Sequence, residues 1–310
     1  MSRKRRSSAR EDLSRQPTLV SERVGQLFVG DDRLEYTEFG SGDRWVVLLP
    51  GQLMPRTMHA PLARILASQG NHVVTLDPLG HGRSDRPEDP RGLSTTAVAE
   101  QTIALLDHLG AETAVIGGTS LGANISLEVA VLAPERVQGL LLEMPVLDNA
   151  VEAGILAFAP LLFAGRFAPV LVWGLATTSR LVPRGPMPHW VRVVLETMEQ
   201  RPASMAATVH GLFFGRVAPP ARARRQITAP TLIIGHPRDP IHLAADARML
   251  AEEVAGSTYV EASSILEWRL RPERLTRRAV DFTESVWRTS VSQRSEGDWS
   301  STRGSGAALP

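Results

Sequence analysis

Short apolar runs alternate with helical stretches along most of the chain, and this alternation limits the folds that are open to it. Each run is largely apolar throughout, which is typical of strands buried on both faces of a parallel sheet. Strands that alternate with helices predict an α/β fold with a doubly wound, mostly parallel sheet, whose sites form at the carboxyl ends of the strands. The runs are Trp45–Leu49, His72–Leu76, Thr113–Gly117, Val137–Met144 and Pro230–Gly235.

The helix expected after the second run has clear end signals. Ser94 or Thr95 is a suitable N-cap, and Gly110 can terminate the helix after Leu109. Further helices are expected near His59–Ser68, Leu121–Ala133, Ala244–Val254 and Pro272–Trp287, with a last strand near Thr258–Val260.

The domain organisation follows from where this alternation stops. Residues 21–146 and 221–288 form the predicted core, and residues 147–220, which are rich in Ala, Leu, Phe and Pro, form a predicted helical cap. Residues 1–20 are predicted to be a disordered basic tail, and residues 289–310 a second disordered tail.

Composition excludes several classes of function. The formal net charge is +1 and the clustered basic residues are confined to the amino terminus, so no nucleic-acid partner is expected. The absence of cysteine excludes disulfides and cysteine-based metal sites, and it makes a reducing cytoplasm the expected location. Ala153–Ala176 is apolar enough to suggest a membrane span, but Pro160, Arg166 and Pro169 interrupt it, so no stable membrane insertion is expected.

Ser120 is the candidate nucleophile. It lies in Gly118-Thr119-Ser120-Leu121-Gly122, directly after an apolar strand and before a helix. A strand–turn–helix with small residues two before and two after the serine can hold the hydroxyl exposed in a strained turn. A serine that merely caps the helix is the alternative interpretation, and the order of the surrounding elements favours the nucleophile.

With this motif the chain resembles the α/β-hydrolase-fold superfamily across roughly residues 25–288. The stretch Asp77–Asp85 is similar to the family's Asp-x-x-Gly-x-Gly-x-Ser segment, in which the position of His81 usually braces the loop. Pro50 replaces a histidine common in the family, but the backbone after Gly51 is still available. The resemblance therefore implies that the N–H groups of Gln52 and Leu121 form an oxyanion hole, and a simple Pro-Gly turn at Pro50-Gly51 is the alternative interpretation.

The resemblance also implies a triad acid and base. By position, Asp239 is the acid, with Asp148 as a fallback, because some members carry the acid after the preceding strand. Alignment of the Pro272-Glu273 pair with the family puts Ile265 where the catalytic histidine is expected, and no histidine follows His242. An isoleucine cannot accept the Ser120 proton.

Several histidines are therefore candidates for the catalytic base. His242 or His236 could reach Ser120 from beside Asp239, and His189 or His210 could reach it from the cap. His242 is the residue assigned here, with a surface or loop-bracing role as its alternative.

These residues together predict an enzyme that hydrolyses an ester or related acyl bond of a small, partly apolar substrate, with no cofactor and no metal. The alternative is a non-hydrolytic protein on the same fold, either a ligand-binding pseudoenzyme or a lyase-like enzyme. The sequence does not indicate an oligomeric state.

Overall fold

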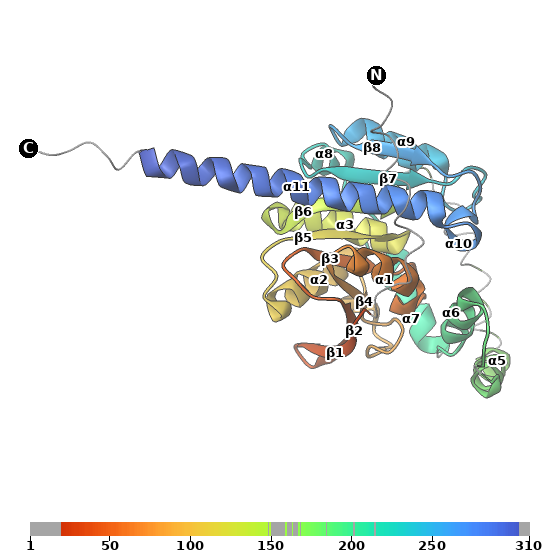
Figure 1. Ribbon diagram of the computed structural model, residues 1–310. Helices are drawn as coiled ribbons and strands as arrows, with labels where there is room; N and C mark the ends of the chain where they lie inside the picture. Colours follow the sequence, from red (N-terminus) through yellow and green to blue (C-terminus); the bar gives the residue numbers. More distant parts are fainter. Residues whose placement is uncertain are drawn as a thin grey trace, which may run out of the picture.

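The computed structural model describes residues 20–147, 149, 159, 163, 167, 169–183, 185–200, 202–213 and 215–303, and its centre is one eight-stranded sheet (Figure 1). The strand order is β1-β2-β4-β3-β5-β6-β7-β8. The first two pairings are antiparallel and all others are parallel, which confirms the predicted fold class. The strands are β1 (Glu22–Val29), β2 (Asp32–Phe39), β3 (Trp45–Leu49), β4 (His72–Asp77), β5 (Ala114–Thr119), β6 (Val137–Glu143), β7 (Thr231–Gly235) and β8 (Thr258–Glu261).

Helices cover both faces of the sheet. On one face lie α1 (Ala60–Ser68) and α11 (Glu273–Arg303), and Figure 1 shows α11 continuing well past the sheet edge. On the other face lie α2 (Thr95–Leu109), α3 (Leu121–Leu132), α8 (Ala221–Arg224) and α9 (Ala244–Glu253). Short helices complete the core: η1 (Arg56–His59), η2 (Pro90–Gly92), η3 (Pro134–Arg136) and α10 (Glu267–Leu270).

Strand β3 shows why the apolar runs are continuous. Val46 and Leu48 pack in the cluster that includes α1 and α11, whereas Val47 and Leu49 pack in the cluster on the opposite face. All four side chains are buried. Because successive strand residues point to opposite faces, a strand covered on both sides needs apolar residues at every position.

The hairpin of β1 and β2 differs from the sequence-based prediction, in which no strand precedes Trp45. The pattern of β2 hides a strand because it contains buried acidic residues. Glu35 is paired with Arg56 at 2.6 Å, and Glu38 lies 2.8 Å from the His72 ring. These contacts with neighbouring elements allow the carboxylates to be buried, and sequence periodicity cannot reveal such partners.

The end signals of α2 are confirmed. The hydroxyl of Ser94 accepts a hydrogen bond from the Ala97 N–H at 3.2 Å, and Gly110 adopts the left-handed conformation with φ 68°. The carboxyl end of α11 differs from prediction, because the helix continues to Arg303 where a loose tail from residue 289 was expected. No proline follows Pro272 before Pro310, and extending an existing helix costs less than starting one. The predicted amino-terminal tail lies outside the described residues, apart from Val20.

Among the described residues between β6 and α8, the chain forms the helices α5 (Pro169–Leu181), α6 (His189–Met198) and α7 (Pro202–Phe213). Figure 1 shows α5 and α6 at one end of the molecule, away from the sheet. We call residues 147–220 the insertion. Within the described part of the chain, no helix is long and apolar enough to cross a membrane.

Candidate active site

Ser120 stands on a sharp turn between β5 and α3. Its backbone has φ 56° and ψ −111°, an unfavourable conformation for a residue with a side chain. The Ser120 N–H donates to the Glu143 carbonyl at 2.8 Å, and its carbonyl accepts from the Asn124 N–H at 3.1 Å. These bonds hold the strained turn in place.

The glycines on either side of Ser120 permit this turn. A Cβ atom at Gly118 or at Gly122 would clash with the carbonyl oxygen of Leu49 on the neighbouring strand β3. The backbones of β3, β5 and α3 therefore approach as closely as they do only because both positions lack side chains.

His242 lies beside Ser120. Its Nε2 atom is 2.8 Å from the Ser120 Oγ, and its Nδ1 atom is 3.0 Å from Asp239 Oδ2. Both Asp239 and His242 lie on the loop between β7 and α9. The structure thus brings together the three residues that the sequence analysis named, in an unbroken hydroxyl–imidazole–carboxylate chain.

The loop fixes Asp239 through its own backbone. Asp239 Oδ1 accepts hydrogen bonds from the N–H groups of Ile241 at 2.8 Å and His242 at 2.9 Å. Burial opposes ionisation of Asp239, but the hydrogen bonds from the His242 side chain and from these backbone groups outweigh it and lower its pKa to about 2. The carboxylate is therefore charged at neutral pH and can orient the imidazole.

The other histidines considered have different partners. His236 is buried with its Nδ1 atom 3.0 Å from the Ser264 carbonyl, and its Nε2 atom is 3.1 Å from Glu143 Oε1. His189 contacts the Met58 carbonyl at 3.4 Å. His210 is exposed on α7. The fallback acid Asp148 lies outside the described residues.

The groups implied for the oxyanion hole line the same cavity as Ser120. Leu121 is the first residue of α3, so its N–H has no carbonyl partner within its own helix. Gln52 lies in a turn closed by a hydrogen bond of 3.0 Å from the Met54 N–H to the Gly51 carbonyl. Both residues therefore lie at the cavity that holds the serine, at the positions that the resemblance implies.

This cavity has a volume of about 370 Å³ and is bordered mainly by apolar side chains. Trp190 reaches it from α6 of the insertion. Ile265, at the position where the family's histidine was expected, and Leu266 form part of its wall. Such a site fits a ligand with an apolar portion.

Arg269 is a charged lining residue that the sequence analysis missed. It donates to the buried carboxylate of Glu143 at 2.8 Å, and its guanidinium lies 4.8 Å from the centre of the Trp190 ring. Burial opposes ionisation of Glu143, but Arg269 and His236 together hold its pKa well below the usual range. No sequence pattern links these residues, because they come from β6, α10, α6 and the loop after β7.

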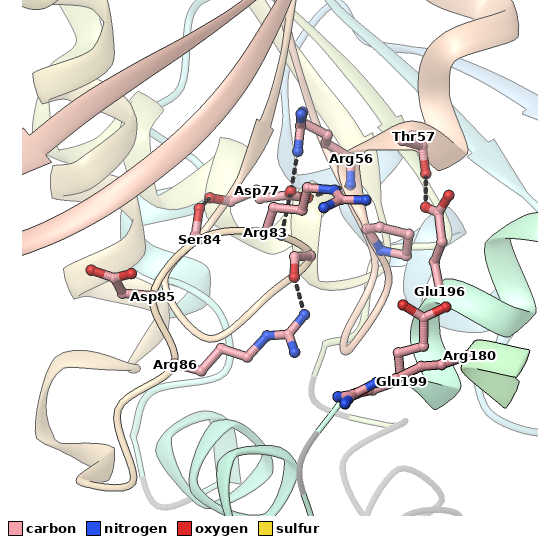
Figure 2. A pocket seen from close by; sticks show the side chains of 12 residues that line it. Arg56, Thr57, Asp77, Arg83, Ser84, Asp85, Arg86, Arg180, Glu196 and Glu199 are labelled. Atoms are coloured by element: carbon pink, nitrogen blue, oxygen red, sulfur yellow. Dashed lines mark hydrogen bonds and ion pairs between the residues drawn. The ribbon is translucent and has the colours of Figure 1, made fainter. Parts of the chain in front are cut away.

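The loop Asp77–Asp85 borders a second cavity, of about 680 Å³, which Figure 2 shows. Asp77 is fully buried, pairs with Arg56, and accepts from the Arg83 N–H at 2.8 Å. His81 is buried with its Nδ1 atom 3.2 Å from the Leu79 carbonyl. Burial lowers its pKa to about 4, which agrees with the predicted bracing role.

Comparison with known proteins supports the same fold. A family model described as the alpha/beta hydrolase fold matches residues 44–177. The crystal structure of an enol-lactonase from Burkholderia xenovorans superposes with a TM-score of 0.66 at 22% identity, over 83% of this chain and 99% of that one. The chain is therefore a protein with the α/β-hydrolase fold.

Curated relatives agree over parts of the chain. A 3-oxoadipate enol-lactonase from Acinetobacter baylyi is 26% identical over 77% of this chain and 89% of its own length. A 2-hydroxymuconate semialdehyde hydrolase from Pseudomonas putida is 40% identical, but the match covers 24% of this chain and only 27% of that protein. These relatives are of the hydrolase kind, and the chain resembles them in sequence as well as in fold.

Proposed function

We propose that the protein is a serine hydrolase that cleaves an ester or related acyl bond through Ser120. The observation that carries this proposal is the 2.8 Å separation between Ser120 Oγ and His242 Nε2, with Asp239 behind the imidazole. A serine hydroxyl needs an adjacent base to become a nucleophile, and His242 is a base within hydrogen-bonding distance. The non-hydrolytic alternative was based on the apparent lack of a base, so the position of His242 favours the hydrolytic proposal over it.

In the proposed reaction, His242 accepts the Ser120 proton as Oγ attacks the substrate carbonyl carbon. The Gln52 and Leu121 N–H groups hold the negative charge that develops on the carbonyl oxygen. The imidazolium then protonates the leaving oxygen, which departs and leaves an acyl group on Ser120. Water attacks this ester with His242 as base, and the acid product leaves as Oγ regains its proton.

Two observations support the proposed substrate. The cavity of about 370 Å³ suits a small molecule, and its apolar wall suits a partly apolar one. A lactone is a cyclic ester, so the similarity to enol-lactonases favours an ester or a related acyl bond. Trp190 at the cavity supports the proposal that the insertion, residues 147–220, acts as a cap.

A fluorophosphonate serine-hydrolase probe tests the proposal. We expect labelling of the wild-type protein, none with Ser120→Ala, and strongly slowed labelling with His242→Ala. His108→Ala is the matched control, because His108 is an exposed histidine of α2 that contacts Tyr36. Labelling that persists in Ser120→Ala would contradict the proposal. An unlabelled wild-type protein that still binds apolar ligands would favour the non-hydrolytic alternative.

A further inference from the structure

The amide, hydroxyl and charged side chains that line the Ser120 cavity are, with one exception, engaged by other protein groups. Asn124 donates to the carbonyls of Val146 and Val217 at 2.8 and 2.9 Å, and its oxygen accepts from the Val146 N–H at 3.0 Å. The Thr119 hydroxyl donates to Glu143 at 2.5 Å. Ser120, His242 and Asp239 bond to one another, and Arg269 donates to Glu143.

Gln52 is the exception. Its side chain is only 9% exposed, and neither its amide nitrogen nor its amide oxygen has a hydrogen-bond partner among the described residues. A buried amide without partners destabilises the folded state, whereas a leucine or methionine of similar size would not. Folding therefore gives no reason for a glutamine at this position.

The backbone around Gln52 is fixed. The turn from Gly51 to Met54 places the next residue, Leu53, in the left-handed region with φ 63°, which is strained for a residue with a side chain. Gln200 of the insertion donates to the Leu53 carbonyl and holds this conformation. Gln52 lines the cavity, and a rigid turn fixes its backbone.

We propose that the side chain of Gln52 recognises a hydroxyl or carbonyl group of the substrate, close to the carbonyl that Ser120 attacks. This inference rests on the proposed function, in which the Gln52 backbone N–H binds the oxyanion. Two methylene groups separate the amide from the Cα of the same residue, so the recognised group lies a few bonds from the reacting carbon. A carboxamide offers both a donor and an acceptor, which suits a neutral oxygen substituent. The substrate class is an oxygenated acyl compound, apolar elsewhere.

Matched esters test this inference: 4-nitrophenyl butyrate and its 2-hydroxy and 3-hydroxy derivatives. We expect kcat/KM of the wild-type protein to favour one hydroxy ester by about tenfold, the size of a net hydrogen bond that replaces an unpaired buried group. Gln52→Leu should remove that preference, whatever its effect on the rate that the three esters share. Dividing the wild-type preference by that of the variant cancels the intrinsic reactivity of the esters. Gln52→Met provides a second apolar replacement.

Gln101→Leu is the matched control. Gln101 is also a buried glutamine, but its amide oxygen accepts from the Leu79 N–H at 3.1 Å. The same substitution should therefore lower the melting temperature at position 101 and maintain or raise it at position 52. The preference for the hydroxy ester should be unchanged in Gln101→Leu.

Calorimetric titration of the same esters into Ser120→Ala separates this inference from the proposed function. Binding about tenfold tighter for one hydroxy ester, lost in Ser120→Ala/Gln52→Leu, supports the role of Gln52 even when the wild-type protein cleaves none of the esters. Hydrolysis by the wild-type protein without preference for either hydroxy ester overturns the inference and leaves the hydrolase intact. A preference that survives Gln52→Leu overturns it as well.

Discussion

The imidazole of His242 lies 2.8 Å from the hydroxyl of Ser120, although 122 positions separate the two residues in the chain. The same imidazole is 3.0 Å from the carboxylate of Asp239, three positions earlier on one loop. The proposed acid and base thus come from a single loop after β7, and the segment after β8, where the family's histidine was expected, contributes Ile265 to the cavity wall. This arrangement makes the role of each residue testable by substitution.

Replacement of His242 should have the largest effect on turnover. In His242→Ala nothing accepts the Ser120 proton, so we expect kcat for an activated ester to fall by about 10⁴-fold or more with little change in KM. Steady-state kinetics measure this, with His108→Ala as control. A loss below about tenfold would show that another group acts as the base.

Asp239→Asn should remove the negative charge beside the His242 imidazole while it leaves the shape of the loop unchanged. The amide oxygen can still accept the backbone N–H groups of Ile241 and His242, so the loop keeps its shape. The imidazolium loses its charged partner, and we expect kcat to fall by roughly 10³- to 10⁴-fold. The control is Asp107→Asn, an exposed carboxylate paired with Arg136. Equal activity of both variants would exclude Asp239 as the acid.

Stability should fall as the pH drops from about 6.5 to 4. Burial lowers the pKa of both His59 and His81 to about 4, whereas in the unfolded chain a histidine titrates near 6.5. Between these values the unfolded state binds more protons, so each group reduces the free energy of unfolding by up to about 1.4 kcal/mol per pH unit as the pH falls.

Urea unfolding at pH 7.5, 6.5, 5.5 and 4.5 measures this slope. In His81→Asn, the new amide nitrogen can reach the Leu79 carbonyl that the imidazole contacts. Unlike the imidazole, the amide does not titrate in this pH range. The two histidines together make the free energy of unfolding depend on pH, and we expect this contribution to be about half as steep in the variant. An unchanged slope would mean that His81 is not buried in its neutral form.

Gly122→Ala should destabilise the fold more than an ordinary glycine substitution. The added methyl group clashes with the backbone of Leu49, and backbone atoms on a central strand cannot move aside cheaply. We expect a loss of about 3 kcal/mol or more in the free energy of unfolding. Gly174→Ala in α5 meets no atom within 4 Å and should stabilise by up to about 1 kcal/mol. Equal effects at the two positions would contradict the close packing described here.

Much of the fold could be predicted because burial in the folded protein requires residue patterns that are visible in short stretches of sequence. Strands buried on both faces show as apolar runs, and the capping of α2 by Ser94 and Gly110 depends on adjacent residues. The hairpin of β1 and β2 could not be predicted in this way, since its acidic residues are buried through partners on other elements. The same limit applies to Arg269 and Glu143, which pair across 126 positions.

The sequence by itself determined the α/β architecture, the position of Ser120 on its turn, and the short list of histidines from which a base could come. Only the tertiary structure shows that His242, among these histidines, lies beside the Ser120 hydroxyl. Strands β5 and β7 are separated by β6 alone, so their carboxyl ends lie about 10 Å apart, a gap that an imidazole on the β7 loop can span. That proximity depends on the order of strands in the sheet, which no local pattern around Ser120 or His242 records. The lack of hydrogen-bond partners for the Gln52 amide among the described residues could not be predicted from the sequence either, because it depends on which groups surround the side chain in the folded protein.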